Sequence, residues 1–287
     1  MNKQLLAETR QSSYWMEINP TGTISDYPWE AKREGIKFED DELAILKQTL
    51  IHEGYFQTRP VISQSQLECL IELIDGVMSA GHSPAYALLY DEFFSVMASL
   101  SNLIAGLLGQ NFLIVPDEPD VYFIPTSDEH SGSGPHRDTL RFPEMYTDEG
   151  LPKMINIWIP ITDATTENSC MHVIPAQYDD DYKTPRSMDE LADHLPNQAL
   201  QKVRALPAAA GSVLGWSTEL IHWGGMSSDQ AKIPRLSFAM YFQRGDCANY
   251  HPSAMAPSSR IPFDLRLYCI EKVWADPDGK NIGQFLG

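Results

Sequence analysis

The chain has 287 residues, of which 43% are hydrophobic, and a formal net charge of −18 at pH 7. The apolar content and the six tryptophans can form a packed core, which excludes an intrinsically disordered chain. Because so acidic a surface repels phosphate backbones, we expect no nucleic-acid partner. No apolar run reaches about 18 residues, so we expect no membrane-spanning segment.

The cysteines point to the compartment. Cys69, Cys170, Cys247 and Cys269 show no Cys-x-x-Cys spacing, which is typical of reduced thiols rather than of disulfides or zinc ligands. The first ten residues lack the long apolar segment of a secretion signal. We therefore expect a cytoplasmic protein.

The N-terminal part of the chain predicts helices. Residues 1–40 mix prolines, glycines and aromatics without a clear period, and predict an irregular arm. Apolar periodicity then predicts three helices. They are expected over about 40–53, 64–79 and 90–108, with Asp40 or Asp41 capping the first, Ser63 capping the second, Gly54 and Gly81 ending these two, and a strand over 55–62 between them.

After Gly109 the pattern changes to short strands rich in β-branched and aromatic residues. They are expected over 112–115, 121–124, 154–161, 171–175, 212–216, 220–223 and 236–243. Helices followed by many short antiparallel strands predict a mainly β protein with flanking α-helices. Its core is expected to be a double-stranded β-helix, the jelly roll of cupin-like proteins.

We interpret residues 1–287 as one domain, since all-β units commonly reach about 200–250 residues and no internal repeat divides the chain. Its expected parts are an irregular arm (1–40), a helical support (41–110), a jelly-roll core (111–245) and a C-terminal extension (246–287). The core is expected to contain a weakly patterned insertion (176–205) with a short helix near 188–194.

One short motif suggests a metal site. His136-Arg137-Asp138 is a His-x-Asp step, and side chains at i and i+2 of a strand point to the same face. Two histidines and one carboxylate form the facial triad of non-haem Fe(II) oxygenases. From the composition about one such step is expected by chance, so alone it is better interpreted as a solvated turn.

His222 is the candidate for the third ligand. It lies 84 residues after Asp138, a gap long enough to cross a jelly roll and return on a neighbouring strand. Gly224 and Gly225 beside it allow close approach of the backbone. Taken alone, it is better interpreted as a core histidine satisfied by hydrogen bonds.

Arg235 stands at the head of an apolar strand thirteen residues later. An arginine drawn into a barrel requires a carboxylate that it can bind through two hydrogen bonds. A dicarboxylate co-substrate would supply one, and Ser237 lies on the same face of the strand. The alternative is a surface arginine paired with an acidic residue.

Together, four motifs in this order resemble the phytanoyl-CoA dioxygenase family of Fe(II)- and 2-oxoglutarate-dependent oxygenases. The motifs are His136-x-Asp138, the segment 156–175, the segment 211–225 and Arg235-x-Ser237, and the resemblance extends over about 40–245. It implies Fe(II), 2-oxoglutarate and O₂ as cofactor and co-substrates.

The resemblance also implies roles for individual residues. His136, Asp138 and His222 would ligate the iron. Arg235 and Ser237 would bind the distal carboxylate of 2-oxoglutarate, with Trp158 packed near it and Thr139 as a further contact.

Two motifs depart from the family pattern. The usual Pro-Gly-Ser-His is Pro175-Ala-Gln-Tyr178, and the usual Asn-Gly-Cys-Leu is Asn168-Ser-Cys-Met171. Neither involves the expected ligands, so the differences concern the substrate and the subfamily. Asp138 occupies the position at which halogenating relatives have a small residue, and hydroxylation or a related oxidation is therefore expected.

These inferences predict a dioxygenase that hydroxylates an unactivated C–H bond of a small-molecule metabolite in a biosynthetic pathway, releasing succinate and CO₂. Arg137, Arg141 and Phe142 are candidates for substrate contacts, although solvated surface positions would also account for the two arginines. The alternative is a non-catalytic jelly-roll protein that binds a metal or another ligand. Arg235 beside a complete triad argues against it. The sequence leaves the oligomeric state open.

Overall fold

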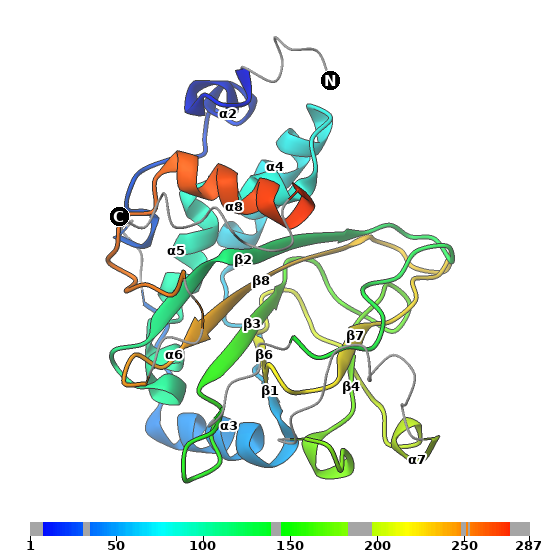
Figure 1. The fold of residues 1–287 in the computed structure, drawn as a ribbon. Coiled ribbons are helices and arrows are strands. Elements are labelled where there is room, and N and C mark those ends of the chain that lie inside the picture. The colour runs from blue at the N-terminus through cyan, green and yellow to red at the C-terminus, as the bar shows by residue number, and fades with distance from the viewer. Residues whose placement is uncertain are drawn as a thin grey trace.

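A computed structural model describes residues 8–30, 35–138, 145–182, 197–247, 251 and 253–275. These residues form two antiparallel β-sheets and a set of helices (Figure 1). The helices are α2 (Ser12–Ile18), α3 (Asp40–Glu53), α4 (Gln64–Ser79), α5 (Asp91–Ser99), α6 (Ser101–Leu108), α7 (Asn197–Leu200) and α8 (Phe263–Ala275), with short 3-10 helices η1 (Pro28–Glu30), η2 (Pro84–Leu89) and η3 (Ala176–Tyr178).

The larger sheet has the strand order β1-β6-β3-β8-β2, and the smaller has the order β5-β4-β7. All neighbouring strands in both sheets are antiparallel. The strands are β1 (Tyr55–Gln57), β2 (Leu113–Ile124), β3 (Met154–Pro160), β4 (Met171–Val173), β5 (Arg204–Leu206), β6 (Leu214–Ser217), β7 (His222–Gly224) and β8 (Arg235–Gln243). The predicted mainly β architecture with flanking helices is confirmed.

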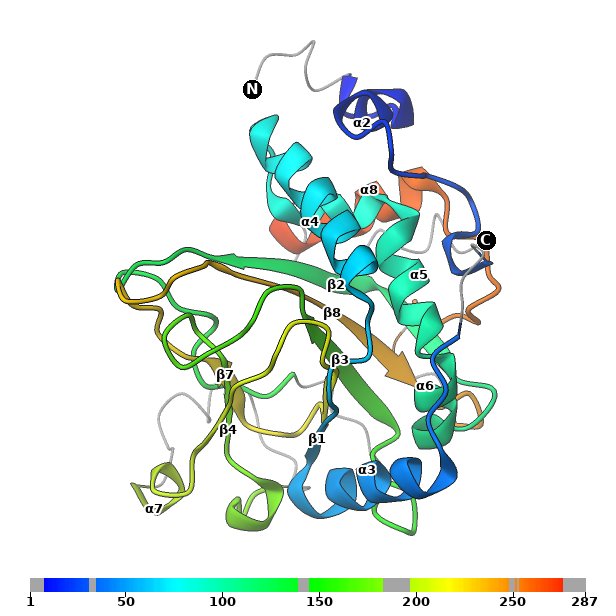
Figure 2. The same ribbon diagram turned by 180° about the vertical axis from the view of Figure 1, so that it is seen from behind.

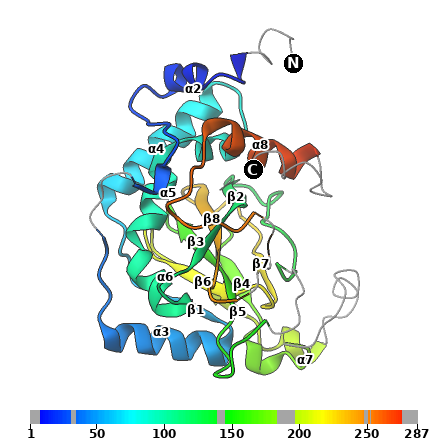
Figure 3. The ribbon, with the colours of Figure 1, turned by 60° about the vertical axis from the view of Figure 1, so that its left-hand side comes forward.

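The larger sheet is covered on both faces. Helices α4, α5 and α6 follow one another along one side of it (Figure 2), and the smaller sheet lies on the other side (Figure 3). Ile155, Ile157 and Ile159 of β3 belong to the hydrophobic cluster that includes the helices. Trp158 belongs to a second cluster, together with residues of the smaller sheet such as Met171. Every residue of β3 is therefore buried, and its side chains alternate between the two cores.

Two predicted helices have the expected bounds. In α4, Ser63 forms a capping box, because its hydroxyl accepts from the Gln66 N–H while the Gln66 side chain accepts from the Ser63 N–H. The N-cap of α3 is Glu39, so the prediction that Asp40 or Asp41 caps it is wrong. Both aspartates instead lie in the first turn, where negative charge favours the helix dipole.

The predicted helix over 90–108 is two helices, α5 and α6, bent by 58°. The hydroxyls of Ser99 and Ser101 donate to the carbonyls of Val96 and Ala98, and such local bonds compete with the helical ladder. Among the described residues no single helix is long and apolar enough to cross a membrane; this bent pair passes that test by length and composition only.

Other elements differ from the sequence prediction. The expected irregular arm contains α2, whose buried Trp15 stacks on Tyr86. The C-terminal extension contains α8, and the insertion contains η3, α7 and the beginning of β5. The strand expected over 55–62 is shorter, because Pro60 has no N–H to donate to a ladder. The two strands expected between 112 and 124 are one strand, β2, with a register shift between Val115 and Asp120.

Candidate metal centre

The segment that carries His136 is held against β7 by main-chain hydrogen bonds. The His136 N–H donates to the His222 carbonyl at 3.1 Å, and the His222 N–H donates to the His136 carbonyl at 2.9 Å. Gly132 and Gly224 permit this approach, since a Cβ on Gly132 would lie 2.7 Å from the Gly224 Cα. Two ligand candidates 86 residues apart in sequence are therefore directly opposite one another.

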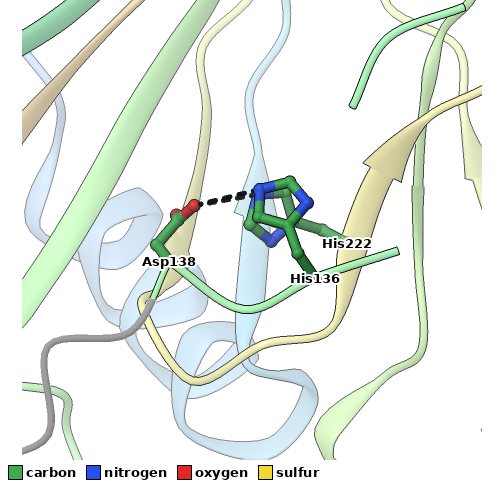
Figure 4. A group of neighbouring side chains, drawn as sticks. All are labelled: His136, Asp138 and His222. Atoms are coloured by element: carbon green, nitrogen blue, oxygen red, sulfur yellow. Dashed lines mark ion pairs between the residues drawn. The ribbon is translucent and has the colours of Figure 1, made fainter. Parts of the chain in front are cut away.

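Three donor groups converge at this point (Figure 4). Asp138 Oδ1 lies 3.4 Å from His136 Nε2 and 3.3 Å from His222 Nε2. The three side chains offer ligand atoms that all lie within 4.8 Å of one another. The two imidazole rings are 4.4 Å apart, centroid to centroid. The structure thus brings together all three residues that the sequence singled out as ligands.

The Nδ1 atoms of both imidazoles are held by hydrogen bonds to main-chain carbonyls. His136 Nδ1 lies 2.7 Å from the Gly134 carbonyl, and His222 Nδ1 lies 3.0 Å from the Leu220 carbonyl. Since a carbonyl only accepts, each Nδ1 carries a proton and each Nε2 can direct a lone pair at a metal. The donor set fits Fe(II), for which two imidazoles and one carboxylate are a common ligand set.

Charge also favours a cation here. Burial raises the pKa of Asp138, but His222 and His136 lower it more, so the pKa lies well below its ordinary value. Burial lowers the pKa of His136, but its hydrogen bonds to Asp138 and to the Gly134 carbonyl outweigh burial and raise it overall. Asp138 is therefore an anion at neutral pH and can serve as the single negative ligand.

Two residues that the sequence did not single out hold Asp138 from the other side. Trp216 Nε1 donates to Asp138 Oδ2 at 2.9 Å, and Asn156 Nδ2 donates to the same oxygen at 3.3 Å. A signal was present for Asn156, because it is the one polar residue in the apolar strand Met154–Pro160 and a buried amide requires partners.

The centre opens into a pocket between the two sheets, and Arg235 and Trp158 line it. Arg235 is 2% exposed, and its Nη1 donates to the Ser169 carbonyl at 2.5 Å. Its Nε has no partner among the described residues, and neither has the buried Oγ of Ser237. The guanidinium carbon lies 5.6 Å from the centre of the Trp158 ring. Burial lowers the pKa of Arg235 to about 10, so it remains a cation at neutral pH.

Arg137 lies between His136 and Asp138 in the sequence, but its side chain binds other groups of the protein. Its Nη1 donates to the Glu219 carbonyl, and its Nη2 lies 2.7 Å from Asp179 Oδ2 in a buried ion pair. It is not among the residues that line the cavity. Its predicted contact with substrate has no support in this geometry; the ion pair instead ties the ligand segment to the start of the insertion.

This ion pair leads to a stability prediction. Asp179→Ala would leave the Arg137 cation buried without its acid, which typically costs about 3–5 kcal/mol. We expect the melting temperature of the metal-free protein to fall by roughly 6–20 °C, measured by calorimetry. The neighbouring Asp180 is exposed, and Asp180→Ala is the matched control with little expected change. Equal melting temperatures for the two variants would contradict the role of the pair.

Three further candidates, Thr139, Arg141 and Phe142, lie outside the described residues, as does the short helix expected near 188–194. Their predicted roles stay predictions. The division of the chain into one domain with four parts is likewise an expectation of the sequence.

The fold and the donor set define a class: a mainly β protein with a cavity between two antiparallel sheets and a site of two histidines and one carboxylate. Residues 116–233 match the model of the phytanoyl-CoA dioxygenase (PhyH) family. The match contains His136, Asp138 and His222, and it confirms the predicted family resemblance. No curated protein matches the chain.

Solved structures share the fold at low sequence identity. One is the epimerase SnoN in complex with Fe³⁺, alpha-ketoglutarate and nogalamycin RO (TM-score 0.57, 15% identity, 76% of this chain and 96% of that one). Another is the non-haem alpha-ketoglutarate-dependent carbocyclase SnoK from nogalamycin biosynthesis (TM-score 0.57, 16% identity, 78% and 88%). A third is HygX from Streptomyces hygroscopicus with nickel and 2-oxoglutarate bound (TM-score 0.51, 13% identity, 73% and 88%).

Proposed function

We propose that this protein is a non-haem Fe(II)- and 2-oxoglutarate-dependent dioxygenase with a jelly-roll core that oxidises a small-molecule metabolite. His136, Asp138 and His222 are the proposed iron ligands. Arg235 and Ser237 are proposed to bind the distal carboxylate of 2-oxoglutarate, beside Trp158. The reaction we propose is hydroxylation of a C–H bond with O₂, with release of succinate and CO₂.

One observation carries the proposal: a buried cation without an acidic partner among the described residues lies in the same cavity as the donor cluster. A buried charge requires compensation. A dicarboxylate that reaches from the metal to Arg235 would supply it, and would also give Ser237 Oγ an acceptor. A protein that only stores or senses a metal has no evident use for this arginine.

When bound, the iron centre supplies the oxidation of 2-oxoglutarate and of the substrate by O₂. The protein binds and orients both molecules. Arg235 neutralises one end of the keto acid, and the Trp158 ring beside the guanidinium limits the positions open to it. Both sheets contribute residues to the walls of the pocket, which keep the groups inside it partly shielded from solvent. His136 is the most exposed of the three ligand candidates, with 35% of its side chain accessible. We therefore propose that the substrate enters on this side.

Chelation is a direct test. Aerobic protein with Fe(II) and 2-oxoglutarate is expected to release succinate slowly even without substrate, since oxidation of the keto acid is then uncoupled. Chelation by EDTA should abolish the release, and added Fe(II) should restore it, whereas Zn(II), which has no redox chemistry, should not. Succinate formation is measured by mass spectrometry. Release that survives chelation, or that Zn(II) supports, would refute the proposal.

The type of oxidation requires a separate measurement, because the similar structures include an epimerase and a carbocyclase. Once a substrate is found, hydroxylation predicts a product that gains one oxygen atom. Epimerisation would leave the mass unchanged, and ring closure would remove two hydrogens. Product mass spectrometry under ¹⁸O₂ distinguishes the three outcomes.

A further inference from the structure

We propose that Trp216 and Asn156 are positioning residues that hold Asp138 as a one-oxygen ligand and so keep a metal position open for the co-substrate. This inference rests on the proposed function, and its test is arranged so that either can fail without the other.

The two oxygens of Asp138 have different partners. Oδ1 lies 3.4 Å and 3.3 Å from the two imidazole Nε2 atoms. Oδ2 accepts from Trp216 Nε1 at 2.9 Å and from Asn156 Nδ2 at 3.3 Å. The Asp138 side chain is 4% exposed, so its surroundings are almost entirely protein. One oxygen thus faces the metal position, while the other is occupied by two N–H groups.

The two donors are held by the larger sheet. Asn156 of β3 and Trp216 of β6 are paired directly across neighbouring strands. Both are buried, and both line the cavity. The orientation of the Asn156 amide follows from chemistry, because an ionised carboxylate only accepts and must face the NH₂ group. The Trp216 ring also packs against the His222 ring, with 4.7 Å between the two ring centroids.

We call the two hydrogen bonds from Trp216 and Asn156 to Asp138 Oδ2 the clamp. The number of coordination positions on the metal explains why the clamp matters. A carboxylate can bind a metal through one oxygen or through two. With both oxygens and two imidazoles, Asp138, His136 and His222 would occupy four of six octahedral positions. A keto acid that binds through two atoms would then leave no position for O₂. With one oxygen, three positions remain.

The clamp predicts different effects on the metal and on the co-substrate. When the Trp216 donor is removed, Asp138 loses orientation, which weakens metal binding. It also gains a free second oxygen, which strengthens metal binding. For 2-oxoglutarate the second change is only harmful, because the keto acid would have to take the two positions from which its distal carboxylate reaches Arg235, and the second oxygen of Asp138 can occupy one of them. A hydrogen bond that merely stabilised the fold would affect stability and both affinities together.

The test uses Trp216→Phe, with Co(II) as the metal and 2-oxoglutarate added without O₂. We expect Co(II) affinity within about threefold of wild type. The affinity of the Co(II)-loaded protein for 2-oxoglutarate should fall by about 10-fold or more, a change of at least about 1.4 kcal/mol in binding free energy. The visible absorption of Co(II) should change before 2-oxoglutarate is added, since the carboxylate coordinates differently.

Trp29→Phe is the matched control, because Trp29 is also buried but packs against Phe112 and Phe242 on the helical side of the larger sheet. It should leave both affinities unchanged. Asn156→Ala removes the other donor and is expected to act in the same direction, which provides a test if Trp216→Phe does not fold. An unchanged 2-oxoglutarate affinity in the variants would overturn the clamp, and so would parallel losses of both affinities. Failure of wild type to bind 2-oxoglutarate would overturn the proposed function instead.

Discussion

Asp138→Asn is expected to abolish metal binding and 2-oxoglutarate turnover while the protein stays folded. The amide has the shape of the carboxylate, and its oxygen can still accept from Trp216 Nε1 and Asn156 Nδ2. It carries no charge, and its NH₂ group would face the imidazoles in place of the anionic ligand. We expect Fe(II) affinity to fall by more than about 100-fold, beyond the usual effect of losing a residue that only orients a ligand.

Asp138→Glu separates charge from position. It keeps the negative charge but extends the side chain by one methylene, which moves the oxygen by about 1.5 Å and suits octahedral geometry poorly. Fe(II) affinity and succinate formation should decrease in the order wild type, Glu, Asn. Anaerobic Fe(II) titration and circular dichroism of the metal-free proteins measure binding and folding separately. Wild-type affinity in Asp138→Asn would mean that Asp138 is not a ligand.

The sequence was sufficient to bring the three ligand candidates together. His136 and Asp138 are two residues apart in an extended segment, and their side chains can therefore meet. The 84-residue gap between Asp138 and His222 is long enough for the chain to return on a neighbouring strand. In the structure the chain does return there, because His136 and His222 form an antiparallel main-chain bridge. Four motifs in order gave these positions a specificity that a single His-x-Asp step lacks.

What surrounds the ligands could not be predicted in this way. The contacts of Trp216 and Asn156 with Asp138 depend on the register between β3 and β6, which no local pattern encodes. Arg137 has a charge that suits an anionic substrate, but its partner Asp179 lies 42 residues away in an insertion with weak patterning. Long-range ion pairs of this kind become visible only in three dimensions.

One departure from the family motif has a physical consequence. Where the usual pattern has glycine, this chain has Ser169, with a positive φ of 73°. Glycine adopts this left-handed conformation without steric penalty, whereas serine has a Cβ that makes it unfavourable. The Ser169 carbonyl accepts from Arg235 Nη1. The strained residue therefore lies at the arginine that we propose for co-substrate binding, as strained residues near functional sites often do.

Arg235→Met is expected to weaken 2-oxoglutarate binding strongly without lowering the stability of the metal-free protein. A charge-assisted bidentate pair in a buried site contributes roughly 2–4 kcal/mol, or about 30- to 1000-fold in affinity. Methionine fills much of the same volume and carries no charge. Because no acid among the described residues pairs with the buried guanidinium, its removal relieves an unfavourable burial, as replacing buried ions with apolar side chains often does.

The two effects are measured on the same samples. Thermal unfolding of metal-free wild type and Arg235→Met should give a melting temperature for the variant that is equal or higher. Added 2-oxoglutarate should raise the melting temperature of the metal-loaded wild type, because a ligand of the native state stabilises it, and should have little effect on the variant. Arg235→Lys is the matched control. It keeps the charge but cannot donate two parallel hydrogen bonds to one carboxylate, so we expect an affinity for 2-oxoglutarate between those of wild type and Arg235→Met. If Arg235→Met bound 2-oxoglutarate as wild type does, Arg235 would not be the carboxylate site. A large loss of stability in the metal-free variant would show instead that Arg235 serves the fold.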